Sequence, residues 1–267
     1  MRRLFLTALI LSLLTAVFTG CSKRAEEPPV ELPPEPEIIV PAEMTDSQAA
    51  AHNAGISPSD VNLVQLTQPA VGSQMAVIRT NHGDIEVMLY PRFAPNAVEN
   101  FTAHARSGYY TGLDFDKVMR NFIIEGGDSG GGGESIFGDE RSRHEYSLNL
   151  WNFRGAVGMA DLDGGFGSRF YIVHAPFVDA DTLSAMEAAN YPEKVIDAYR
   201  ELGGVPGFDW QNTVFGMVTE ESIQTVDAIA RLPQNPDGST DEFVLIQSIE
   251  IVTVDVSPQG DGEDDPG

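Results

Sequence analysis

The fold is decided by the stretch Phe115-Asp116-Lys117-Val118-Met119-Arg120-Asn121-Phe122-Ile123-Ile124-Glu125-Gly126-Gly127-Asp128. Polar residues recur at two-residue spacing in an apolar run that ends at a Gly-Gly-Asp turn, which is typical of two short half-buried strands. Alternation places Phe115 and Lys117 on one face and Asp116 and Val118 on the other. The stretch therefore predicts a sheet surface on which apolar groups border a Lys and a Glu, as on a barrel rim or in a binding groove.

Strand and helix patterns continue on both sides of this stretch. Residues 75–80 and 85–90 alternate as strands and are joined at Asn81-His82-Gly83, a hairpin turn because Asn and Gly accept positive φ. A helix is predicted from Pro95 to Gly108, and a second over 222–232. Residues 155–160, 170–174 and 243–254 are expected to be further strands.

Six segments, taken in order, resemble the cyclophilins, a family of peptidyl-prolyl isomerases: 80–89, 94–101, 115–128, 158–160, 167–172 and 214–216. The resemblance covers residues 74–255, some two thirds of the chain. It implies a mainly β fold, namely a closed eight-stranded antiparallel barrel capped by two helices. The segment 177–206 is longer than the corresponding segment in the compact members of the family. It is predicted to form a helical insertion on the barrel rim.

The N-terminus reads as an export signal. Residues 1–20 have a basic start and an apolar run too short to span a bilayer, and Gly20 precedes Cys21, the single cysteine of the chain. This step resembles a bacterial lipobox, in which the thiol is lipidated, although Phe18 departs from the usual Leu. The alternative is a plain secretory signal. We expect a protein anchored to a bacterial membrane through Cys21, with its domain on the extracytoplasmic side.

The segments that flank the domain have little capacity to form a core. Residues 21–73 are predicted to be a linker rich in Pro and acids, with a possible helical turn over 45–51, and residues 256–267 an acidic disordered tail. The chain has 40 acidic and 16 basic residues, a formal charge of −24. Direct binding to nucleic acid is not expected at such a charge.

Peptidyl-prolyl isomerisation needs no nucleophile, metal or cofactor. Resonance in the X–Pro amide sets a barrier of about 18 to 20 kcal/mol, and a catalyst must hold the proline ring and aim a donor at the twisting bond. The resemblance implies the substrate-binding residues Phe115, Phe122, Ile123, Ala160, Asp161, Tyr171, Phe208 and Asn212, and the catalytic residues Lys117, Glu125 and Arg169. No metal site is predicted, because the five histidines lack ligand spacing.

The polar site positions depart from the family. Lys117 stands where the family has a catalytic Arg, Glu125 replaces a Gln, and Arg169 replaces a second Gln. Lys is a point charge without the planar fork of Arg. Arg169 could therefore supply the missing guanidinium, held by Glu125; the alternative is a plain surface ion pair worth at most about 1 kcal/mol. Gly207, where many members carry Trp or His, predicts weak binding of cyclosporin-like ligands.

Three functions follow from these observations. The first is an isomerase that assists proteins folding outside the cytoplasm, with proline-containing polypeptides as partners. The second is a proline-peptide binding module whose catalysis has decayed, which Lys117 and Glu125 favour. The third is a structural surface lipoprotein, which the intact apolar pocket disfavours. An isomerase assay discriminates between them.

Overall fold

The computed structural model describes residues 46–128, 133–138 and 142–254. The predicted signal peptide, Cys21, the first part of the linker and the acidic tail lie outside these residues. Within the described ranges, no helix is both long and apolar enough to cross a bilayer.

Eight antiparallel strands form one sheet in the order β3-β4-β6-β5-β7-β2-β1-β8. Alternating burial along β1 sends Ala76, Ile78 and Thr80 into the barrel interior, as the period of two predicts. The strands are β1 Gln74–Thr80, β2 Gly83–Leu89, β3 Lys117–Val118, β4 Ile123–Gly126, β5 Ala156–Leu162, β6 Gly165–Val173, β7 Val214–Val218 and β8 Ile246–Thr253.

The sheet curls into a barrel that is open at one seam, so the prediction of a closed barrel needs correction. The strands at the two ends of the sheet, β3 and β8, do not pair with each other. The seam is bridged by the irregular segment before β3, where Phe115 N–H donates to Val244 O at 2.9 Å and Ile246 N–H donates to Leu113 O at 2.8 Å. Strand β3 is too short to supply a continuous ladder at this edge.

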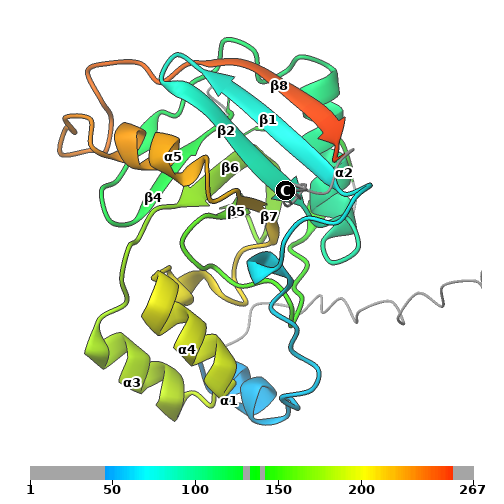
Figure 1. The fold of residues 1–267 in the computed structure, drawn as a ribbon, viewed down its shortest axis with the longest axis vertical. Coiled ribbons are helices and arrows are strands. Elements are labelled where there is room, and N and C mark those ends of the chain that lie inside the picture. The colour runs from blue at the N-terminus through cyan, green and yellow to red at the C-terminus, as the bar shows by residue number, and fades with distance from the viewer. Residues whose placement is uncertain (1–45, 129–132, 139–141, 255–267) are drawn as a thin grey trace, which may run out of the picture. The chain divides into compact units, whose positions relative to one another are not determined.

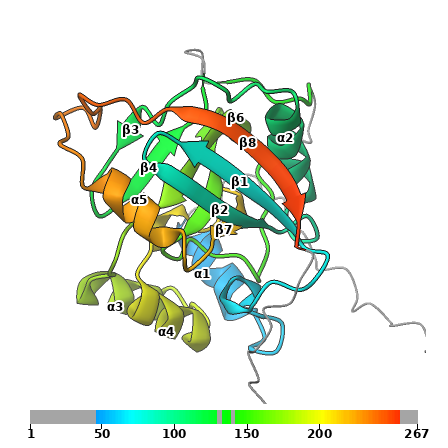
Figure 2. The same ribbon diagram turned by 45° about the horizontal axis from the view of Figure 1, so that its top comes forward.

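Two helices pack on the barrel, as predicted (Figures 1 and 2). Helix α2, Pro95–Arg106, contacts β6 and β8 and buries Val98, Phe101 and Ala105 along one face. Helix α5, Ile223–Ala230, contacts β2 and β4 and buries Val226 and Ile229. Both stripes have the three-to-four-residue spacing that turns a helix face toward a core.

The insertion forms two helices, α3 Ala180–Ala188 and α4 Glu193–Leu202. Asp179 caps α3 by accepting from Thr182 N–H at 2.9 Å, which satisfies a free amide of the first turn. The two helices pack together with the N-terminal helix α1, Asp46–Ala54, away from β1, β2 and β8 (Figures 1 and 2). Their shared cluster is separate from the barrel core and consists of Val61, Trp151, Phe153, Met186, Val195, Ile196, Ala198, Tyr199 and Trp210.

Residues 46–66, which we expected to belong to the linker, are part of this second core. Val61 is fully buried, and the Gln65 side chain bonds both to Trp151 N–H at 2.7 Å and to Trp151 O at 2.9 Å. The Trp210 indole donates to Asn53 Oδ1 at 3.2 Å. Because these contacts are made by isolated residues at wide spacing, no helical or strand period marks the segment as buried.

Candidate active site

The sheet register brings the predicted polar residues together. Lys117 on β3 lies opposite Glu125 on β4, and Glu125 lies opposite Tyr171 on β6. Arg169 precedes Tyr171 by two residues on β6, which places both side chains on the same face. Three neighbouring strands therefore supply Lys117, Glu125, Arg169 and Tyr171 to one surface.

Arg169 is held by a cluster of carboxylates. Its Nε–H group donates to Glu125 Oε1, its Nη2 to Asp116 Oδ1, and its Nη1 lies 3.6 Å from Asp128 Oδ2. The Lys117 ammonium donates to the same Glu125 oxygen at 3.3 Å. Arg169 and Glu125 are only 14% and 12% exposed, whereas Lys117 is 48% exposed. A guanidinium has five N–H donors, so this arrangement fixes the plane of Arg169 and leaves donors for a further acceptor.

The predicted face of Phe115 is wrong. Phe115 is 1% exposed and packs edge-to-face against Phe170 in the barrel core, at 5.6 Å between ring centroids. Asp116 and Lys117 are both exposed and both reach the cluster around Arg169 and Glu125. The reason is that regular strand pairing begins only at Lys117, so strict alternation does not extend back to Phe115. Phe115 supports the site from behind and does not line it.

An aromatic group lies beside the cluster. Phe208 packs edge-to-face against Phe122 at 5.3 Å and against Tyr171 at 5.2 Å. Phe122 and Phe208 are partly exposed, while Tyr171 and Ile123 are buried beneath them. Asn121 takes a φ of 59°, which turns the chain between β3 and β4 and presents Phe122 at the surface. The predicted members Phe122, Ile123, Tyr171 and Phe208 are thus brought together, and a flat apolar ring fits such a surface.

The end of β5 forms a further edge of the site. Ala160 is buried and Asp161 is exposed, and the pairing of β5 with β6 shifts register between Met159 and Asp161. Such an irregularity leaves the extra residue, Ala160, out of the ladder between the two strands. The Asn212 side chain donates to Met159 O at 3.1 Å, which ties it to this edge.

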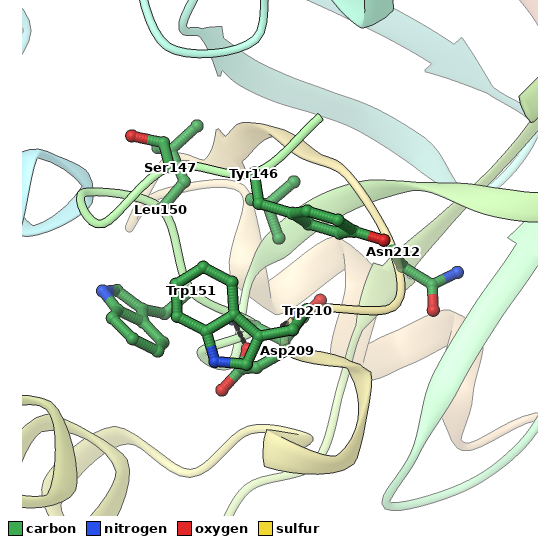
Figure 3. Close-up of a pocket in the computed structure, with 9 residues that line it drawn as sticks. Tyr146, Ser147, Leu150, Trp151, Asp209, Trp210 and Asn212 are labelled. Carbon is green, nitrogen blue, oxygen red and sulfur yellow. Dashed lines mark hydrogen bonds between the residues drawn. The ribbon is translucent and has the colours of Figure 1, made fainter. Parts of the chain in front are cut away.

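Buried polar residues behind the site escaped the sequence analysis. His144 lies 3.3 Å from Asp161 and accepts from Thr213 N–H through Nδ1; burial lowers the pKa of His144 despite the nearby carboxylate. Asn152 and Asp209 lie behind Tyr171 and line a narrow pocket with Tyr146, Trp151, Trp210 and Asn212 (Figure 3). Isolated residues in irregular segments carry no periodic signal, so only the tertiary structure reveals them. Metal-ligating clusters of three or more residues are absent from the described ranges.

The fold and the site together define a class of protein: an antiparallel barrel with an aromatic surface beside a cluster of oriented cationic donors. Residues 75–251 match the family model described as cyclophilin type peptidyl-prolyl cis-trans isomerase/CLD. The chain belongs to the cyclophilin-type peptidyl-prolyl cis-trans isomerases.

Relatives in two staphylococci are similar over most of their lengths. A protein named as a peptidyl-prolyl cis-trans isomerase in Staphylococcus aureus (strain USA300) is 39% identical over 184 residues, which is 67% of this chain and 92% of the relative. Its counterpart in Staphylococcus saprophyticus is 39% identical over 196 residues, 72% of this chain and 98% of the relative.

Solved structures agree with this assignment. A cyclophilin type peptidyl-prolyl cis-trans isomerase of Cryptosporidium parvum superposes with a TM-score of 0.53 at 26% identity, over 68% of this chain and 98% of its own. The structure of the same isomerase in the presence of the dipeptide Ala-Pro also superposes with a TM-score of 0.53 at 26% identity. This match covers 67% of this chain and 99% of the solved one. The predicted family, fold class and isomerase activity are therefore confirmed.

Proposed function

We propose that the protein isomerises X–Pro bonds of polypeptides outside the cytoplasm, with Arg169 as the donor that favours the twisted amide. The observation that carries the proposal is the cluster around Arg169, which lies on the same strand and face as Tyr171. Binding of the proline ring by Phe122, Ile123, Tyr171 and Phe208 brings the amide beside the cationic group. The Ala-Pro complex of the Cryptosporidium relative supports a proline-containing ligand.

The electrostatics of the cluster favour an aimed donor. Asp116, Glu125 and Asp128 surround Arg169 and Lys117, so the acids outnumber the bases by one. The carboxylates restrict the guanidinium to one plane before substrate arrives, and a donor already in place needs no reorganisation when charge redistributes in the twisted amide. Lys117 is half-exposed and has a flexible stem, so it contributes charge with less directional control.

The location is proposed from the sequence. The basic start, the short apolar run and the Gly20-Cys21 step support export and lipidation. On this proposal the partners are proteins that fold near the extracytoplasmic membrane surface, and the anchor keeps the isomerase among them.

The test of the catalytic assignment is Arg169→Gln in an NMR exchange assay on an Ala-Pro peptide. We expect catalytic efficiency to fall more than tenfold, at least about 1.4 kcal/mol of transition-state stabilisation. Combining Lys117→Arg with Arg169→Gln should restore part of this efficiency by returning a guanidinium to β3, on the other side of β4.

Arg79→Gln is the matched control, because Arg79 also bridges two carboxylates, Asp84 and Glu250, on an exposed part of β1. It should leave efficiency unchanged. If the isomerisation rate is unchanged in Arg169→Gln but lost in Lys117→Ala, Lys117 is the donor and the assignment of Arg169 is wrong.

A further inference from the structure

Tyr171 carries a hydroxyl group with a buried partner. Tyr171 is 1% exposed, and its Oη donates to Asn152 Oδ1 at 2.7 Å. Its ring lies over Gly158, the opposite residue on β5, where any side chain would collide with the end of the ring. The ring is thus positioned by Phe208 on one side, by the space over Gly158, and by one hydrogen bond at its tip.

Asp209 sets the orientation of the Asn152 amide. Both Asn152 N–H and Asn152 Nδ2 donate to Asp209 Oδ1, at 3.1 and 2.9 Å. Asp209 Oδ1 accepts the backbone N–H of Asn152 and is therefore an acceptor here, so the amide nitrogen of Asn152, which can only donate, turns toward it and the amide oxygen turns toward Tyr171. The Tyr171 hydroxyl therefore finds an acceptor only while Asp209 holds Asn152 in this orientation.

Helix α4 of the insertion holds Asp209. Tyr199 Oη lies 2.8 and 2.7 Å from the two oxygens of Asp209, to which it donates. Burial raises the pKa of Asp209 to about 7, while hydrogen bonds from Asn152 and Tyr199 act in the opposite direction. Burial and the nearby Asp209 raise the pKa of Tyr199 well above its usual value, so Tyr199 keeps its proton and remains a donor.

The backbone brings α4 close enough for this contact. Gly204, just after α4, takes a φ of +139°, and a side chain there would overlap Asn152 O and the Tyr199 ring. Val205 N–H donates to Asn152 O at 2.9 Å. The end of the insertion is therefore attached directly to the residue that bonds to Tyr171.

We propose that Tyr199 is a positioning residue of the proline pocket: it holds Asp209, Asp209 orients Asn152, and Asn152 fixes the Tyr171 ring against Phe208. The inference rests on the proposed assignment of Tyr171 to that pocket. It gives the insertion a role in substrate binding, because a helix outside the barrel sets the shape of the surface that receives the proline ring.

The test is a double-mutant cycle with Tyr199→Phe and Tyr171→Phe, assayed by NMR exchange on the full chain with an Ala-Pro peptide. Tyr199→Phe removes the hydrogen bonds to Asp209 and keeps the ring that packs on Phe153. We expect KM to rise roughly threefold to tenfold, the effect of one lost hydrogen bond, with kcat changed less than twofold. In the Tyr171→Phe background, Tyr199→Phe should leave KM unchanged, because no hydroxyl remains to be positioned.

Met186→Ala is the control for stability alone. Met186 is buried in the same cluster but lies on α3 and makes no hydrogen bond in the chain from Tyr199 to Tyr171. It should lower Tm without raising KM. A rise in KM that persists in the Tyr171→Phe background, or a fall in Tm with no change in KM for Tyr199→Phe, overturns the positioning role.

Phe122→Ala separates this inference from the assignment of the pocket. If Phe122→Ala raises KM and Tyr199→Phe does not, only the positioning role is wrong. If neither variant changes KM, the pocket is wrongly assigned and the positioning role fails with it.

Discussion

On the proposed assignment, Arg169 on β6 supplies the guanidinium that is missing at position 117 on β3, with β4 between the two strands. The sequence shows Lys117 in place of the family's Arg and an Arg two strands away, and the register joins them through Glu125. The contact to Glu125 was predicted, whereas Asp116 and Asp128 were not. Strict alternation would place Asp116 on the opposite face from Lys117, but regular strand pairing begins only at Lys117 and both side chains reach the same cluster. A guanidinium between several acids is directional, unlike an isolated exposed ion pair.

Phe122 provides the direct test of the aromatic surface. It is partly exposed and its ring centroid lies 5.3 Å from that of Phe208, outside the fully buried core, so we expect the barrel to stay folded when Phe122 is shortened. We expect Phe122→Ala to weaken binding of an Ala-Pro peptide about tenfold or more, because the apolar contact area for the proline ring is lost. An NMR titration of peptide and protein resonances measures this.

Phe243→Ala removes a ring of the same size that is 67% exposed elsewhere on the chain. It should bind the peptide as the unsubstituted protein does. If Phe122→Ala binds the peptide with the same affinity as the unsubstituted protein, the peptide binds on another surface.

At the scale of elements, strands and helices with a clear period could be predicted and irregular segments could not. The β1–β2 hairpin, α2 and α5 follow from alternation, turn residues and apolar stripes. The open seam could not be predicted from the sequence, because β3 is only 2 residues long and the bridging hydrogen bonds come from residues with no strand pattern. The contact of Tyr199 with Asp209 joins an insertion to a loop, and no local rule links the two.

Helix α2 has a buried carboxylic acid at its N-terminus. Glu145 is 2% exposed and accepts from Ala97 N–H at 2.9 Å and from the Asn96 side chain at 3.2 Å. Burial raises the pKa of Glu145 from 4.5 to about 7, although these hydrogen bonds act to lower it. The unfolded chain therefore loses this proton at a lower pH than the folded chain.

This difference makes stability depend on pH with a defined sign. Between about pH 4.5 and 7 the folded state binds more protons at Glu145 than the unfolded state, so the free energy of unfolding falls as pH rises. We expect the unfolding free energy of the unsubstituted protein, minus that of Glu145→Gln, to fall by up to roughly 3 kcal/mol across this window. Urea titrations at pH 5 and pH 8 measure it.

Glu99→Gln removes one charge from an exposed position of the same helix and accounts for the general effect of net charge. If the change in unfolding free energy caused by Glu145→Gln equals that caused by Glu99→Gln at both pH values, the raised pKa of Glu145 is contradicted.

For the whole molecule, the sequence predicts an anchored enzyme. Mass spectrometry of the mature protein should find acylated Cys21 as its first residue, and Cys21→Ser should move the protein from the membrane fraction to the soluble fraction. A mature chain that lacks Cys21, or carries it without an acyl group, would contradict the lipid anchor. The formal charge of −24 over the whole chain disfavours direct adsorption to an anionic lipid surface.

The packing of Gln65 and Val61 also determines how far the N-terminus can be shortened in a recombinant protein. A recombinant chain that begins at Gln74, where the family resemblance starts, keeps all eight strands but loses α1 and both Gln65 hydrogen bonds to Trp151. Trp151 and Trp210, now 1% and 6% exposed, would then lose covering side chains and present apolar surface to solvent. An expression boundary at or before Asp46 retains the segment on which those two tryptophans depend.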